Sequence, residues 1–163
     1  EEQGLLEKLS DNPSAEVRKA LAGALDYAAT PENPGIIALV LKLVEDKDEA
    51  VRQSAILSLR HARTKEVTAK LLDILGGQQP TAVRVNAVEI LGALGRGNVA
   101  NLIVASHDPD PEVRQRAMPW LRMFHTPDAV AALEEGTTDP DERVRKCATA
   151  ELKWLRENAT GAR

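Results

Sequence analysis

The sequence predicts an all-α protein, a right-handed α-solenoid (α-α superhelix) of about five antiparallel helix pairs. The first observation is that the dipeptide Val-Arg recurs five times along the 163 residues, with spacings of 34, 32, 30 and 31. The second is that each copy follows turn-forming residues and precedes an alanine-rich amphipathic run. The third is that aromatic residues make up only 2% of the chain, so the core must be built from small and aliphatic side chains. Stacked helix pairs suit such a core.

Each Val-Arg dipeptide lies near the start of a predicted helix, and we call these five the Val-Arg helices. Counted from the Val, apolar residues fall at positions +4, +7, +8 and +11. These positions lie in one stripe of a helix, which indicates a single buried face. The stripe consists of Leu21, Ala24, Leu25 and Ala28 in the first copy and of Ala87, Ile90, Leu91 and Leu94 in the third.

The starts of the Val-Arg helices carry capping residues. Ser14, Asp48, Asp110 and Asp141 each lie three residues before a repeated Val, where a side-chain oxygen can accept a backbone N–H. Pro80 takes this position in the third copy, so we expect that helix to begin less firmly. Shorter partner helices are expected at residues 5–9, 36–44, 67–75, 99–105 and 129–133.

These elements predict one repeat domain over residues 1–157 and a polar tail at 158–163. The five units are expected at residues 1–30, 31–64, 65–96, 97–125 and 126–157. Because the first helix is short, we expect the sequence to be part of a longer solenoid or multidomain chain.

Two segments carry a family resemblance. Residues 108–114 read Asp-Pro-Asp-Pro-Glu-Val-Arg, and residues 139–145 read Asp-Pro-Asp-Glu-Arg-Val-Arg. The chain resembles HEAT-like repeat proteins of the short, bilin-lyase-type class, with units of about 31 residues, over nearly its whole length. The resemblance implies that the Val-Arg helices line the concave side and the shorter helices the convex side. It implies little about function, because this scaffold carries many activities.

The repeated arginines lie at the edge of the buried stripe, and aspartates recur at matching positions of neighbouring turns. We therefore expect an Asp–Arg ladder that connects adjacent repeats, rather than a row of phosphate-binding cations. The arginines are Arg18, Arg52, Arg84, Arg114 and Arg145, and the aspartates are Asp46, Asp108 and Asp139.

No residue pattern predicts catalysis, a metal site or a cofactor. His61, His107 and His125 lie in different repeats and lack the paired His-Glu spacing of metal-dependent HEAT-type hydroxylases. Cys147, next to Lys146, is expected to be a partly buried filler rather than a reactive thiol. The single cysteine needs no oxidising compartment, and no apolar run is long enough to cross a bilayer. The cellular compartment stays open, with the cytoplasm slightly favoured.

The exposed side of the Val-Arg helices is the predicted binding surface. Positions +2, +6, +9 and +10 point away from the core, and their charges sum to +3 although the whole chain carries −4. We therefore expect a mildly basic groove that attracts acidic partners. The candidate partner-binding residues are Lys19, Tyr27, Arg60, His61, Glu89, Arg116, Arg122, Met123, Lys146, Lys153 and Trp154.

Large side chains at position +10 are candidate anchors of an interface. Tyr27, Met123 and Trp154 lie there. Two alternatives stay open: Trp154 could cover the open end of the stack, and Tyr27 could pack on the first helix pair. Pro119, inside the fourth Val-Arg helix, removes a backbone hydrogen bond, so we expect a kink between Arg114 and Pro119.

The leading functional prediction is a non-catalytic protein- or peptide-binding scaffold that uses the concave face. One alternative is a nucleic-acid-binding solenoid that uses the basic groove. The net negative charge and the few aromatic residues available for base stacking oppose it. The other alternative, a bilin-lyase-like enzyme or enzyme subunit, rests on the family resemblance alone.

Overall fold

The structure, a computed structural model, describes residues 2–159 and the side chains of residues 4–158. The described residues are all-helical, with ten α-helices and one short 3₁₀ helix. The Val-Arg helices are α2 (Ala15–Ala24), α4 (Glu49–Leu57), α6 (Thr81–Ala93), α8 (Pro111–Phe124) and α10 (Glu142–Ala159). Their partners are α1 (Glu2–Ser10), α3 (Pro34–Val44), α5 (Lys65–Gly76), α7 (Val99–Ala105) and α9 (Pro127–Gly136), with the 3₁₀ helix η1 at Arg96–Asn98.

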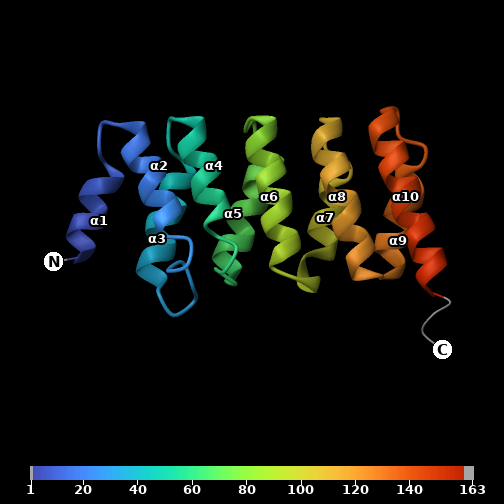
Figure 1. Cartoon of the computed structure of the whole chain (residues 1–163), viewed down its shortest axis with the longest axis horizontal. Coiled ribbons are helices and arrows are strands. Elements are labelled where there is room, and N and C mark those ends of the chain that lie inside the picture. The colour runs from blue at the N-terminus through green and yellow to red at the C-terminus, as the bar shows by residue number, and fades with distance from the viewer. Residues whose placement is uncertain (1, 160–163) are drawn as a thin grey trace. The chain divides into compact units, whose positions relative to one another are not determined.

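The helices form two compact units, which we call unit 1 (Glu1–Leu94) and unit 2 (Gly95–Arg163). In unit 1, α1 packs on α2, α3 on α4 and α5 on α6, and the Val-Arg helices α2, α4 and α6 lie side by side in that order (Figure 1). In unit 2, α7 packs on α8 and α9 on α10, and α8 lies beside α10. The predicted all-α solenoid of helix pairs is confirmed.

Every predicted partner helix lies within an observed one, but two Val-Arg helices are shorter than their apolar stripe suggested. α2 ends at Ala24 and α4 at Leu57, after which the chain continues in tight turns. In the first of these turns the Ala28 amide donates to Leu25 O at 3.0 Å. Ala24, the last residue of α2, is exposed rather than buried as predicted.

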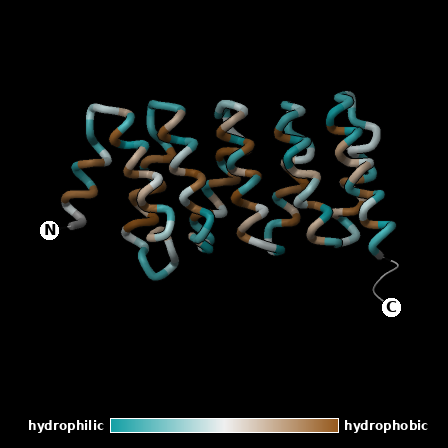
Figure 2. The backbone as a smooth tube through the Cα atoms, viewed as in Figure 1, coloured by the Kyte–Doolittle hydropathy of each residue, from teal (hydrophilic) through white to brown (hydrophobic). Residues whose placement is uncertain are grey.

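The core of each unit is aliphatic, and Figure 2 shows apolar residues on the helices and hydrophilic residues at the turns that precede the Val-Arg helices. Beside the predicted stripe, position +5 is also buried: Ala22, Ile56, Val88 and Met118 are at most 1% exposed. The same position in α10 is Thr149, which is exposed. No helix of the described residues is both long and apolar enough to span a bilayer.

The helix starts agree with the capping prediction except at the first. Asp48 accepts from the Ala50 and Val51 amides, Asp110 from Glu112 and Asp141 from Arg143. Ser14 makes no side-chain cap hydrogen bond, although its amide donates to Asn12 Oδ1 at 2.9 Å. Pro80 makes none either, because its side chain has no hydrogen-bond acceptor.

Two further expectations concern α8 and the end of the chain. α8 runs without a break through Pro119, and a bend within the continuous helix stays a prediction. α10 includes Asn158 and Ala159, which were expected in the polar tail, and residues 160–163 lie outside the described part of the chain. The division into five units stays a prediction.

The repeated arginines hold the turn that precedes their own helix. In Arg18, Arg52, Arg114 and Arg145, Nη1 donates to two successive backbone carbonyls of that turn, at 2.6–3.2 Å, and Arg84 Nη1 donates to Gln79 O. Arg18 also reaches Asp46, and Arg114 reaches Asp139, each through Nε and Nη2. The Asp–Arg ladder is therefore confirmed once within each unit.

Candidate partner-binding surface

The exposed large hydrophobic side chains of the described residues concentrate on the Val-Arg helices and the turns that end them. Four of the six, Tyr27, Leu57, Met123 and Trp154, occupy position +6 or +10 of the repeat, and the other two are Leu5 and Val104. Their exposed fractions are 82% for Tyr27, 51% for Met123 and 42% for Trp154. The exposure predicted for position +10 is thus observed, whereas the role of these residues as anchors stays a prediction.

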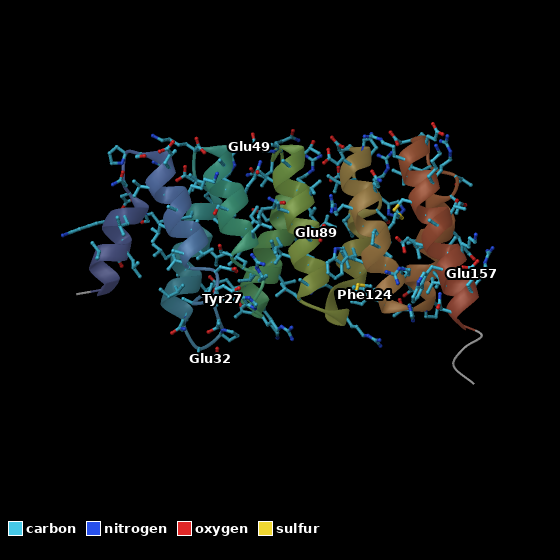
Figure 3. All side chains as sticks on the ribbon, viewed as in Figure 1. Tyr27, Glu32, Glu49, Glu89, Phe124 and Glu157 are labelled. Atoms are coloured by element: carbon cyan, nitrogen blue, oxygen red, sulfur yellow. The ribbon has the colours of Figure 1, made fainter. Side chains whose placement is uncertain are left out.

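In unit 1, Tyr27 and His61 stack on each other. Their ring centroids are 5.6 Å apart and the ring planes differ by 23°. Both residues lie in the turns that follow α2 and α4, at the opposite end of the helices from Glu49 (Figure 3). Tyr27 is thus held by the second helix pair, and its large exposed fraction argues against the alternative that it packs on the first.

Arg60 lies beside this aromatic pair and beside Asp26, which occupies position +9, one of the positions expected to point away from the core. Asp26 is only 9% exposed, and its Oδ1 lies 3.0 Å from Arg60 Nε without the alignment of a hydrogen bond. Asp26 is buried because α2 ends before position +9, so the helical pattern no longer decides which way it points. The exposure expected for position +9 was therefore wrong at Asp26.

In unit 2, Arg122 of α8 covers one face of Trp154 of α10. The guanidinium carbon lies 4.3 Å from the centroid of the Trp154 ring, a cation–π contact. Arg122 Nε is also within 2.5 Å of a Glu151 carboxylate oxygen, and the His125 ring is 6.2 Å from Trp154. Trp154 therefore lies against a side chain of α8. This placement argues against the alternative that Trp154 covers the open end of the stack.

A pocket of about 460 Å³ lies beside Trp154 in unit 2. Val130, Leu152 and Leu155 supply apolar wall, while His125 and Arg156 add polar groups. This size and lining are typical of sites that accept a small ligand or a large side chain. Val130 and Leu155 were not among the predicted partner-binding residues, because nothing in the repeat pattern indicates that residues of α9 and α10 border one pocket.

The basic residues predicted for the groove are mostly paired with carboxylates. Besides Arg60 and Arg122, Lys146 lies 2.8 Å from Glu142, and Lys153 lies 3.8 Å from Glu157. The predicted charge of +3 left out Glu142, Glu151 and Glu157, which lie outside the four counted positions. All three lie in unit 2, where they pair with counted cations and reduce the predicted excess of positive charge, and the basic groove as a whole stays a prediction. Of the other candidates, Lys19 is exposed on α2, Glu89 half-buried on α6 (Figure 3) and Arg116 exposed on α8.

No group of three or more His, Cys, Asp or Glu residues within the described part of the chain could hold a metal ion. His107 Nε2 lies 3.0 Å from Glu135, and the carbonyl of Ile103 together with this carboxylate raises the pKa of His107. The Cys147 Sγ lies 3.8 Å from Gln115 O, and burial raises the pKa of its thiol. Such a thiol is a poor nucleophile at neutral pH, which agrees with the predicted filler.

Comparison with known proteins identifies the class. The HEAT repeats family matches residues 2–92 and 99–162, so the chain belongs to the HEAT repeat family. No curated protein sequence matches it.

Solved structures with a similar fold include two armadillo repeat proteins made by design. One was computationally designed for modular peptide recognition; it is 22% identical with a TM-score of 0.55, and the match covers 91% of this chain and 79% of that one. The other, a designed armadillo repeat protein, is 23% identical with a TM-score of 0.52, covering 92% and 80%. At this identity the likeness shows the fold alone.

Proposed function

We propose that the chain is a non-catalytic scaffold that binds a protein or peptide through the exposed side of its Val-Arg helices. The observation that carries the proposal is the placement of Tyr27, Leu57, Met123 and Trp154 at two repeat positions on that side. Each unit thus carries two large exposed side chains on its Val-Arg helices or the turns that end them, and such side chains are the usual anchors of an interface.

Two of these side chains already contact a neighbouring side chain in the chain alone. Tyr27 stacks on His61, and Trp154 is covered on one face by Arg122. A side chain that is already ordered loses less conformational entropy on binding, so it contributes more to affinity. The peptide recognition stated for one designed armadillo protein supports the same use of this architecture.

The chemistry of the surface favours a partner with apolar or aromatic side chains. The pocket beside Trp154 is walled by Val130, Leu152 and Leu155, whereas Lys146 and Lys153 are already paired. For the same reason the nucleic-acid alternative has less support, since binding to phosphates needs several cations free to replace counterions.

The test is a selection of random linear peptides on the wild-type chain, followed by affinity measurements on variants. We expect Trp154→Ala or Tyr27→Ala to weaken a selected peptide about tenfold or more, as removal of an interface anchor does. Val104→Ala on α7 is the control, because this side chain is also exposed (61%) but lies on a partner helix.

A selected peptide that binds both Ala variants as tightly as wild type would overturn the proposal. So would a selection that yields no specific peptide at all. Circular dichroism of each variant checks that the helices remain folded, which the exposure of both side chains leads us to expect.

A further inference from the structure

Among the four ladder arginines that are followed by another Val-Arg repeat, Arg52 is the one whose matching sequence position carries no aspartate. Arg18 donates Nε and Nη2 to Asp46 at 2.6 and 2.8 Å, and Arg114 donates the same atoms to Asp139 at 2.7 and 2.8 Å. The residue that corresponds to these aspartates in the turn before α6 is Gln78. Arg52 Nε is buried, and it has no hydrogen-bond partner among the described residues.

Arg52 is nevertheless held as the other ladder arginines are. Its Nη1 donates to Asp46 O at 2.7 Å and to Lys47 O at 3.0 Å, which matches the bonds that Arg18 makes to its own turn. With Nη1 anchored in this way, the Nε and Nη2 edge corresponds to the edge that grips Asp46 and Asp139 in the other repeats. A guanidinium edge of this kind matches a carboxylate through two parallel hydrogen bonds.

The surroundings favour a carboxylate supplied from elsewhere. Gln78, at the position of the ladder aspartates, is neutral and exposed, so this position supplies no carboxylate of its own. A buried cationic N–H without a partner is costly, and a carboxylate would remove that cost. Asp46 and Asp139 each also accept a hydrogen bond from the backbone N–H two residues later, that of Asp48 or Asp141. The residue two after Gln78 is Pro80, which has no N–H to donate. Binding at this position would therefore depend on Arg52.

We propose that Arg52 binds a carboxylate from outside the chain, such as the Asp or Glu side chain of an acidic segment or a small organic carboxylate. The site lies at the turns before α4 and α6, the end of unit 1 marked by Glu49 in Figure 3 and opposite to Tyr27. It is thus separate from the aromatic surface of the proposed function, and neither proposal depends on the other.

The first experiment titrates the chain with sodium acetate and, at matched ionic strength, with sodium chloride. We expect acetate to shift the NMR signal of the Arg52 Nε–H saturably. It should also raise the melting temperature above that in chloride. Arg52→Lys, which keeps the charge but loses the planar edge, should abolish the acetate-specific rise.

The decisive variant is Gln78→Asp, with Gln78→Asn as its uncharged control. An internal carboxylate at residue 78 should raise the melting temperature by about 2–4 °C over the Asn variant and should remove the response to acetate. An acetate response in Gln78→Asp equal to that of wild type would overturn the proposal, as would a wild type whose Arg52 signal does not respond.

A second experiment tests whether the carboxylate comes from an acidic protein segment or from a small organic molecule. A short Glu-rich peptide is compared with its Gln counterpart in the same assay. Binding of the Glu peptide at lower concentration than acetate assigns the site to an acidic segment, whereas an acetate response alone assigns it to a small carboxylate. Equal binding of the Glu and Gln peptides at the Arg52 signal contradicts a carboxylate site.

Discussion

At the scale of single residues, a ladder arginine such as Arg114 binds two different parts of the chain with one guanidinium group. Arg114 Nη1 holds two carbonyls of its own turn, while Nε and Nη2 grip Asp139 of the next repeat. Lysine could not replace it, because an ammonium lacks the planar fork that reaches both sides. The side chains of Arg114 and Asp139 are only 12% and 9% exposed. Removing either side chain would therefore leave the other as a mostly buried charge without its partner, which destabilises the fold.

This pairing predicts a pH dependence of stability. The hydrogen bonds from Arg114 and from the Asp141 amide hold the pKa of Asp139 below its usual range. A carboxyl group with a lowered pKa in the folded state stabilises the fold above its unfolded pKa of about 4, and this contribution is lost as the pH falls through the folded pKa. We expect Asp139→Asn to lower the free energy of unfolding by about 2 kcal/mol at pH 7 and progressively less below pH 4.

Urea unfolding at pH 7, 5 and 3, followed by tryptophan fluorescence, measures this difference. Glu134→Gln is the control, since Glu134 is exposed on α9 and should change little at any pH. A loss at pH 3 as large as that at pH 7 would show that Asp139 acts through packing rather than charge.

At the scale of helices, starts and ends obey different rules. A start is set locally, by a capping side chain within a few residues of the amides that it satisfies. Asp48 shows this with bonds of 2.9 and 3.2 Å to the Ala50 and Val51 amides. Ser14, at the same position of the first repeat, makes no such bond, although its own amide donates to Asn12 Oδ1 as the Asp48 amide does to Asp46 Oδ1.

The caps therefore give a matched pair of substitutions. Asp48→Ala should cost about 1 kcal/mol of stability, because two backbone amides of α4 lose their acceptor. Ser14→Ala should cost almost nothing, because the bond at that turn uses the Ser14 backbone. Urea midpoints followed by circular dichroism test both, and equal losses would mean that the hydroxyl of Ser14 caps α2 in solution.

The helix starts and the ladder were predictable because the residues that build them recur at fixed places in the sequence. The helix ends were not, since α2 and α4 stop inside an apolar stripe that continues past them. Every side-chain contact after such an end was therefore missed, including the burial of Asp26 beside Arg60. The contact of Arg122 with Trp154 escaped prediction for another reason: it depends on how two helices pack, which no single repeat encodes.

At the scale of the whole molecule, stability in a repeat protein is close to a sum of terms for each repeat and for neighbouring repeats. The two tryptophans, Trp120 and Trp154, both belong to unit 2, whereas helices occur in both units. Tryptophan fluorescence therefore reports on unit 2, and circular dichroism reports on the whole chain.

These two probes can separate the units through two buried residues, Ile56 in unit 1 and Leu121 in unit 2, both 0% exposed. Truncating either to Ala should cost about 2–5 kcal/mol. Because destabilisation spreads mainly to neighbouring repeats, Ile56→Ala should lower the urea midpoint seen by circular dichroism more than that seen by fluorescence. Leu121→Ala should lower the urea midpoint seen by fluorescence at least as much as the urea midpoint seen by circular dichroism. If both variants move both probes equally, the helix pairs unfold as one cooperative body and the additive description does not apply to this chain.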